Sequence, residues 1–295
     1  MTGHIGLIGA GAMGGAIGAR LVSTGTSLQV FDLDPEKVAA LVARGATSAS
    51  SAAAAATGAR AVILSLNAPH IVRAAIFGPE GVAAGAGPGL LIIDMSSIDP
   101  AATRELAAEA ATRGLRWVDS PLSGGAPKAE LGQLTLMQGG AEADVRETQD
   151  ILAQLASNQT HMGDVGTGQT TKIINQVLCG LGFMAVAEAT ALAEAAGVNV
   201  ARIPAALRGG RADSALLQEY MPRFAARDYR RTGRIDNMVK DLDGARDLAR
   251  QTKTTMPLTA LAAEIHRLLT SAGLGGEDQA ALMEYFSGPN TEKFR

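Results

Sequence analysis

The 295-residue sequence has little of what marks a secreted or a nucleic-acid-binding protein. Cys179 is its one cysteine, so no disulfide framework can form within the chain, and its apolar surroundings favour a buried structural thiol. Aromatic residues make up only 3%, which leaves few stacking platforms for nucleic-acid bases. The net charge is −3 and no basic block stands out, so we expect no nucleic-acid partner and no anionic membrane partner.

Targeting and membrane-spanning segments are also absent from the pattern. The first residues run directly into a strand-like segment, without the basic and apolar regions of a signal peptide. The longest apolar stretch follows Lys172, and Asn175, Gln176 and Glu188 interrupt it, so we do not expect it to span a membrane. These features predict a cytoplasmic protein.

The length predicts two domains, because a typical domain has about half as many residues. Short apolar runs, separated by helical or turn-rich segments, occur at residues 4–8, 28–31, 61–66, 90–93, 115–118 and 134–137. Strands that alternate with helices form right-handed βαβ units and a mostly parallel sheet with both faces covered. The first part of the chain is therefore predicted to be an α/β domain with a Rossmann-type, doubly wound sheet.

The pattern changes near residue 165. A long helical period runs from Gln169 to about Ala196 and is closed by Gly197. Further helical segments are predicted at residues 201–208, 214–226, 236–252, 257–273 and 277–286. We therefore expect domains at 1–165 and 166–295, with an all-α C-terminal domain joined to the first by the long helix. This large apolar helical domain favours pairing of subunits, as a homodimer or a homotetramer.

A glycine-rich turn follows the first predicted strand and opens a helix. It fits the dinucleotide-binding pattern G-x-G-x-x-G, in which the first glycine permits the turn, the second admits the pyrophosphate and the third allows close helix–strand packing. The helix N-terminus adds unpaired N–H groups for the phosphates. The alternative is a plain turn of an α/β fold. The predicted loop comprises Gly9, Ala10, Gly11, Ala12, Met13 and Gly14.

An acid, Asp32, ends the second predicted strand, 18 residues beyond Gly14. At this place a carboxylate accepts hydrogen bonds from ribose hydroxyls and repels a 2′-phosphate. The next residues, Leu33 and Asp34, offer no arginine to compensate. The sequence thus favours NAD, with NADP the less favoured cofactor, although a solvated loop acid is the alternative reading of Asp32.

Two further segments carry polar groups suited to a substrate. The backbone N–H groups of Ser123, Gly124 and Gly125, with the serine hydroxyl, can form a nest for a carboxylate, or they belong to an ordinary loop. Lys172 and Asn175 share one helix face with Gln176, at i, i+3 and i+4 near the start of the long helix. A lysine and two amides are costly to bury in so apolar a helix, so they suggest catalysis, unless they form a solvent-facing patch.

As a set, these motifs resemble the signatures of the β-hydroxyacid dehydrogenases, which include 3-hydroxyisobutyrate and L-threonate enzymes. The resemblance rests on the glycine loop, the segment from Asp119 to Gly125, Gly166-x-Gly168-x-x-x-Lys172-x-x-Asn175 and Lys240-Asp241-Leu242. Among members, the stretches Asn67–His70, Ile93–Ile98, Ser123–Ala129, Asn175–Val177 and Arg208–Gly210 are most similar to tartronate semialdehyde reductases. The resemblance spans nearly the whole chain.

The resemblance implies a role for each of these residues. Lys172 would be the general acid of carbonyl reduction, and Asn175 would hold the substrate in register with it. Ser123, Gly124 and Gly125 would bind the carboxylate of a small substrate, with Gln176 nearby. The cofactor would also be contacted by Leu66, Asn67, Ser96 and Lys240. No metal is implied, and the four histidines, His4, His70, His161 and His266, have no ligand spacing.

The activity implied is NAD-dependent reduction of tartronate semialdehyde to glycerate. The alternatives are a 3-hydroxyisobutyrate-type or L-threonate-type dehydrogenase and, more remotely, a non-catalytic nucleotide-binding protein. The chain departs from the family pattern at Asn67, where proline is usual, and at Gly233, where phenylalanine is usual. Arg211 and Asp213 replace smaller uncharged residues, so substrate identity is the least constrained part of the inference.

Overall fold

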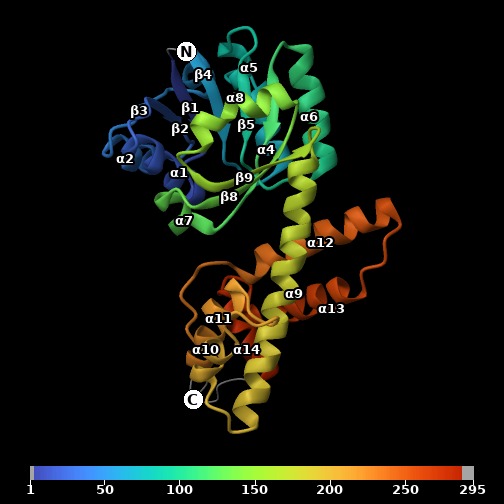
Figure 1. Cartoon of the computed structure of the whole chain (residues 1–295). Helices are drawn as coiled ribbons and strands as arrows, with labels where there is room; N and C mark the ends of the chain where they lie inside the picture. The colour runs from blue at the N-terminus through green and yellow to red at the C-terminus, as the bar shows by residue number, and fades with distance from the viewer. Residues whose placement is uncertain (1–2, 288–295) are drawn as a thin grey trace. The chain divides into compact units, whose positions relative to one another are not determined.

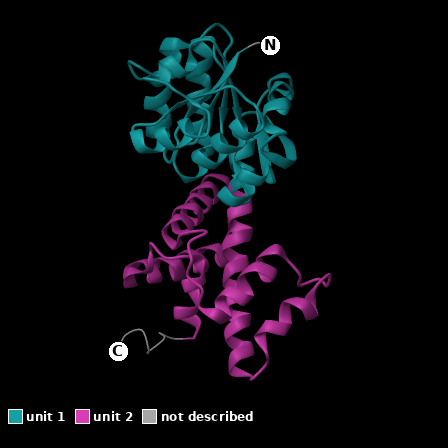
Figure 2. Ribbon diagram, turned by 90° about the vertical axis from the view of Figure 1, so that its left-hand side faces the viewer, with its two compact units in different colours: residues 1–172 teal, residues 173–295 magenta. Residues whose placement is uncertain are grey.

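A computed structural model describes residues 3–287 and divides the chain into two compact units, residues 1–172 and 173–295 (Figure 2). The division falls within one continuous helix, α9 (Thr167–Ala195), which therefore contributes to both units. The first unit contains every strand that the structure assigns between residues 3 and 287, and the second is helical (Figure 1). The predicted fold class, a Rossmann-type α/β unit followed by an all-α unit, is confirmed.

Nine strands of the first unit form one sheet. They are β1 (His4–Ile8), β2 (Leu28–Phe31), β3 (Thr47–Ser48), β4 (Ala59–Leu64), β5 (Leu91–Asp94), β6 (Arg116–Asp119), β7 (Leu122–Ser123), β8 (Leu134–Gly139) and β9 (Ala156–Gly163). The parallel part has the order β3-β2-β1-β4-β5-β6, which is the order of a dinucleotide-binding sheet. Strand β8 adds antiparallel to β6, and both β7 and β9 pair with β8.

Helices cover both faces of this sheet, because successive strand residues point to opposite sides. Leu7, Val30 and Ile63 belong to a core on one face, and Ile8 and Leu64 to a core on the other. The helices are α1 (Ala12–Ser23), α2 (Pro35–Val42), α3 (Ala52–Ala56), α4 (Pro69–Phe77), α5 (Val82–Gly85), α6 (Pro100–Thr112), α7 (Gly125–Leu131) and α8 (Glu142–Leu152).

Strand β9 was not predicted from the sequence. Its residues are mostly polar and exposed, and it pairs on one side only, with β8. An edge strand with so little apolar surface lacks the alternation from which strands are recognised. The predicted strand at 61–66 is also displaced, because β4 ends at Leu64 and leaves Leu66 in the following loop.

The second unit packs its helices around one core, which includes Phe183 of α9 and Phe224. Besides α9 the elements are η1 (Val200–Arg202), α10 (Ile203–Leu207), α11 (Ala215–Ala226), α12 (Ile235–Thr252), α13 (Pro257–Leu269), η2 (Thr270–Leu274), η3 (Gln279–Leu282) and α14 (Met283–Phe286). The helix predicted at 257–273 ends in the π-helical segment η2, where Gly273 has a φ of +85°.

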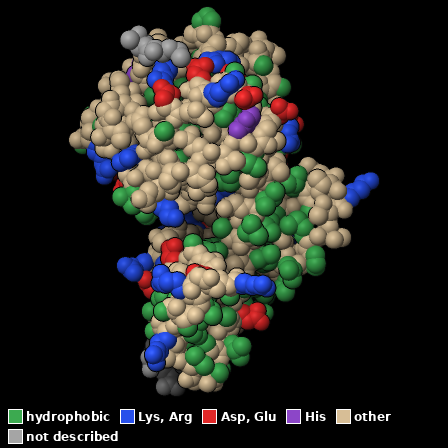
Figure 3. All heavy atoms as spheres, viewed as in Figure 1, with side chains coloured by type: hydrophobic (Ala, Val, Ile, Leu, Met, Phe, Trp, Pro, Cys, Tyr) green, Lys and Arg blue, Asp and Glu red, His purple; other side chains and the backbone are tan. Residues whose placement is uncertain are grey.

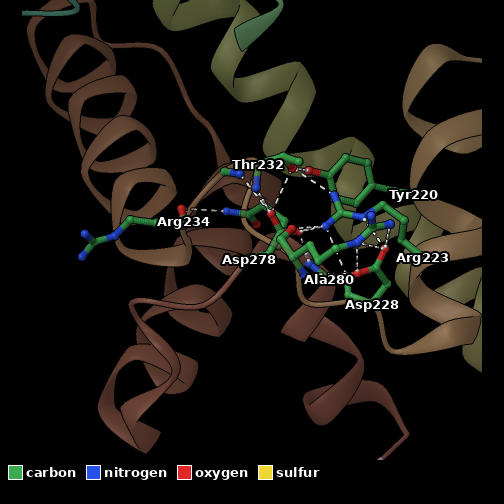
Figure 4. Close-up of polar contacts among 10 residues, drawn as sticks. Tyr220, Arg223, Asp228, Thr232, Arg234, Asp278 and Ala280 are labelled. Carbon is green, nitrogen blue, oxygen red and sulfur yellow. Dashed lines mark hydrogen bonds and ion pairs between the residues drawn. The ribbon is translucent and has the colours of Figure 1, made fainter. Parts of the chain in front are cut away.

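A buried ion pair fastens the loop before α12 (Figure 4). Asp278 is fully buried, and its carboxylate lies 3.1 Å from Nη2 of Arg223. The same carboxylate accepts the backbone N–H groups of Thr232 and Gly233, at 2.6 and 3.0 Å. Gly233 therefore lies in a turn that Asp278 holds.

Helix α9 is long and apolar enough to cross a membrane by length and composition, with a mean hydropathy of 1.5 in its most apolar window. Core helices of soluble proteins pass the same test, and 39% of this window is buried. Apolar side chains also gather on the surface of the second unit, over α9 and α13 (Figure 3). The exposed large apolar residues of α9 and α13 are Ile174, Leu178, Leu192, Leu258, Leu261 and Leu268.

Candidate functional site

A cavity of about 570 Å³ opens in the first unit at the carboxyl ends of β1, β2 and β4. Such clefts beyond parallel strands are where α/β sheets bind ligands. The glycine loop forms one side, Asp32 at the end of β2 forms another, and Leu66 and Asn67 after β4 complete it. The cavity therefore joins cofactor-site residues that the sequence predicted from three separate segments.

The glycines of the loop have distinct structural roles. Gly9 has a φ of +95°, and a Cβ there would lie 2.4 Å from the carbonyl oxygen of Ser65. A Cβ on Gly14 would lie 2.0 Å from the carbonyl oxygen of Gly9, so any side chain would push α1 away from the loop. Gly11 has nothing within 4 Å of such a Cβ. Open space at the N-terminus of α1 fits a pyrophosphate, and the residues present fit a dinucleotide.

The remaining loop residues support this geometry. The N–H of Ala10 donates to the carboxylate of Asp32 at 2.7 Å. Ala12 begins α1, and the partly buried Met13 packs against the core below the loop. The loop is therefore anchored both by packing and by the acid at the end of β2.

The carboxylate of Asp32 is partly committed to backbone donors, since it also accepts the N–H of Asp34 at 2.9 Å. The side chain of Lys37, on the first turn of α2, lines the same cavity and pairs with Asp34 at 3.0 Å. The sequence did not indicate Lys37, because this residue lies in the helix after Asp32 and not among the two residues that directly follow the acid. The first turn of a helix that follows a strand also lies near the carboxyl end of that strand, so position 37 could have been predicted as a cofactor contact.

A hydrogen-bonded network lies beyond β4 and β5. Leu66 donates its N–H to the hydroxyl of Ser96 at 3.1 Å, and Ser96 donates its own N–H to Asp94 at 3.0 Å. Burial raises the pKa of Asp94 to about 7, with smaller opposing effects from Ser96. The predicted cofactor contacts Leu66 and Ser96 are therefore hydrogen-bonded to each other, and Asp94 fixes the position of Ser96.

The predicted carboxylate-binding segment lies between β7 and α7. Ser123 ends β7 and is partly buried, while Gly124 is exposed. Gly124 and Gly125 have φ values of +127° and +74°, which side chains rarely adopt. Consecutive residues of this kind can turn their N–H groups toward one anion. Their carboxylate contact stays a prediction.

The predicted catalytic residues are on α9, with Lys172 in its second turn. In the second unit, the amide of Asn175 donates to Gln176 at 2.9 Å, and Gln176 donates to the carboxylate of Asp241 at 2.5 Å. The ammonium of Lys240 lies 3.5 Å from the same carboxylate. Asp241 thus joins the predicted substrate amides to the predicted cofactor lysine, a role that the sequence did not reveal.

Within residues 3–287, no group of three or more His, Cys, Asp or Glu side chains is placed to hold a metal ion. His266 is buried and bonds to Ala262 and Gln279, and burial lowers its pKa. His161 bonds to the carbonyl oxygens of Gly140 and Gly163. These two histidines therefore have structural partners.

Comparisons with known proteins agree with this geometry. Residues 4–163 match the NAD binding domain of 6-phosphogluconate dehydrogenase, and residues 166–286 match the NAD-binding domain of NADP-dependent 3-hydroxyisobutyrate dehydrogenase. The 2-(hydroxymethyl)glutarate dehydrogenase of Eubacterium barkeri is 33% identical, over 95% of this chain and 93% of the relative. The L-threonate dehydrogenase of Cupriavidus necator is 32% identical, over 98% of this chain and 97% of the relative.

A solved structure gives the same result for the fold. The crystal structure of 3-hydroxyisobutyrate dehydrogenase from Salmonella typhimurium superposes with a TM-score of 0.86 at 33% identity. The match covers 97% of this chain and 100% of that one. Both units therefore have counterparts in that structure. The chain belongs to the β-hydroxyacid dehydrogenase family and is a nicotinamide-dependent dehydrogenase of a CH–OH group.

Proposed function

We propose that the chain interconverts a small 3-oxo acid and the corresponding 3-hydroxy acid with NAD, with tartronate semialdehyde and glycerate as the leading pair. The observation that carries the proposal is the alignment of Lys172, Asn175 and Gln176 along one face of α9. An ammonium group beside amides suits a substrate that carries a carbonyl and a neighbouring hydroxyl group. The ammonium group donates a proton to the carbonyl oxygen, and the amides orient the substrate's oxygen atoms.

In this mechanism the bound cofactor supplies or accepts the hydride. Lys172 donates a proton to the carbonyl oxygen during reduction and removes it during oxidation. Asn175 orients the substrate, and Ser123 with Gly124 and Gly125 binds its carboxylate through N–H and O–H donors. An amide analogue of a good substrate should therefore have a much higher KM than the acid, and equal KM values would contradict the carboxylate contact.

The proposed preference for NAD rests on Asp32, whose carboxylate lines the cavity. A 2′-phosphate beside this carboxylate would be repelled. Lys37 is the nearby cation that could reduce the repulsion, but Asp34 pairs with it. The kcat/KM for NADH should exceed that for NADPH, and Asp34→Asn should narrow the gap by releasing Lys37. Equal values for both cofactors in the unaltered protein would refute the role of Asp32.

The named relatives favour a second candidate. Since similar chains are named for L-threonate, 2-(hydroxymethyl)glutarate and 3-hydroxyisobutyrate, this chain is proposed alternatively to act on one of these hydroxy acids. A panel of these acids with glycerate and tartronate semialdehyde, ranked by kcat/KM, separates the candidates. If a folded protein that binds NADH turns over none of them, the proposed substrate class is wrong.

The role of Lys172 is tested by its replacement. General acid catalysis contributes about 10²- to 10⁴-fold, so Lys172→Ala should lower kcat by that order. The Kd for NADH should change little, because the glycine loop and Asp32 lie in another part of the first unit. Lys172→Arg should not restore the rate, since a guanidinium stays protonated and directs its donors differently. Near-normal turnover of the folded alanine variant would refute the mechanism.

A further inference from the structure

The first turn of α9 is capped by a carboxylate from a distant strand. Asp119, the last residue of β6, is fully buried. Its Oδ1 accepts the N–H of Gly166 at 2.7 Å, and its Oδ2 accepts the N–H of Gln169 at 2.8 Å. These N–H groups lie at the positive end of the helix, so a carboxylate satisfies both the donors and the dipole. The start of α9 is thereby fixed to the end of β6.

Two glycines let this carboxylate approach closely. A Cβ on Gly139 would lie 2.6 Å from Oδ1 of Asp119, and a Cβ on Gly168 would lie 2.7 Å from Oδ2. The second Cβ would also lie 2.4 Å from the carbonyl oxygen of Met137. Burial raises the pKa of Asp119, against the lowering effect of its backbone donors. Because the buried carboxylate of Asp119 is so closely surrounded, the start of α9 has little freedom to shift.

The side chain of Gln169 adds a second attachment. It is buried, donates to the carbonyl oxygen of Ser96 at 2.7 Å and accepts the N–H of Ile98 at 3.3 Å. Ser96 in turn is held by Asp94 and by Leu66. The first turn of α9 is therefore bonded to the segment after β5, which carries a predicted cofactor contact.

We propose that Asp119 and Gln169 are positioning residues, which set the place of Lys172 relative to the strand ends β5 and β6. Lys172 follows Gln169 by three residues, less than one turn, so a shift or rotation of the first turn moves its side chain directly. A displacement of about 1 Å in an active site can lower a rate by about 10²-fold. The inference rests on the proposed role of Lys172.

The test uses Gln169→Met, which keeps the side-chain length but removes both hydrogen bonds. Because a position is disturbed rather than a reacting group removed, kcat should fall about 10- to 100-fold. The Kd for NADH should stay within about threefold, since Asp94 and Leu66 still hold Ser96. The pH profile of kcat should also change, because it reports the groups that titrate in the complex.

Gln138→Met is the matched control. Gln138 is equally buried in the first unit and donates to Thr148 at 2.9 Å, with no bond to α9. This variant should lose a comparable amount of thermal stability while its kcat and pH profile stay unchanged. Equal losses of kcat in the two variants, or an unchanged kcat in Gln169→Met, would overturn the proposal.

A double variant separates this inference from the proposed mechanism. If Gln169 acts through Lys172, Gln169→Met should lower kcat in the unaltered protein but not further in Lys172→Ala. Additive losses would mean that Gln169 acts otherwise, and would overturn the positioning role. If the kcat of Lys172→Ala equals that of the unaltered protein, the proposed mechanism fails instead, and the Lys172→Ala variant alone shows this outcome.

Discussion

Replacement of Asp94 by asparagine should make the protein more stable at neutral and alkaline pH. The folded chain holds the proton of Asp94 up to a pKa of about 7, against an ordinary value of 3.8. Between these values the folded state binds more protons than the unfolded state, so the stability of the unaltered protein falls as pH rises through this window. Asparagine cannot ionise and removes this dependence.

The size of the effect follows from the two pKa values. At ~1.4 kcal/mol for each pH unit, the charged carboxylate costs up to roughly 4 kcal/mol, and more than half of this cost develops between about pH 5 and pH 8. This is an upper value, because hydration of the charged group relieves part of the cost. Oδ2 of Asp94 has no hydrogen-bond partner among the described residues. An amide there adds only a constant, pH-independent offset.

Urea unfolding, followed by tryptophan fluorescence, measures this difference. Trp117, the single tryptophan, is buried in β6 and pairs in register with Ile92 of β5, so it reports on the strands around Asp94. Glu142→Gln, which removes an exposed carboxylate from α8, is the control and should give a flat difference. If the free energies of Asp94→Asn and the unaltered protein run parallel from about pH 5 to pH 8, within about 0.5 kcal/mol, the reasoning is refuted.

Three other variants test the cofactor loop and the second unit. Gly14→Ala should impair folding of the first unit, because its Cβ would meet the carbonyl oxygen of Gly9 at 2.0 Å, whereas Gly11→Ala should fold normally and weaken NADH binding. Thermal unfolding and NADH titration distinguish the two, and equal stabilities would contradict the assignment. Asp278→Ala should lose about 3–5 kcal/mol, because it breaks the buried ion pair with Arg223 and leaves the backbone N–H groups of Thr232 and Gly233 without their acceptor. A loss below about 1 kcal/mol in denaturant unfolding would contradict it.

The sequence predicted those strands and helices whose apolar residues form a clear local pattern. The strands at 4–8 and 28–31 were predicted with their observed bounds, because each is a short apolar run ended by a glycine turn or an acid. Strand β9 was missed because its polar residues gain their pairing from β8, which local periodicity cannot reveal. The long helix was placed to within two residues at its N-terminus, since its apolar period is strong.

The sequence predicted the residues of the candidate site whose motif lies within one short segment of the chain. The glycine loop and Asp32 are recognisable because their spacing follows from one βαβ unit. The bonds from Asp119 to Gly166 and Gln169 join residues 47 and 50 positions apart, so no local pattern indicates them. In the sequence, Asp119 marks only the start of the segment that ends at Gly125, although an acid at the end of a buried strand is itself a signal.

The capping of α9 also determines where the cofactor-binding part of the chain can be cut. The two family matches meet between residues 163 and 166, which suggests a fragment that ends at Val165. Such a fragment would lack Gly166 and Gln169, and would leave the buried carboxylate of Asp119 without either helix donor. A fragment that retains α9 through Lys172 keeps both. In a chimera that exchanges the helical unit, the first turns of α9 should therefore come from the same parent as β6.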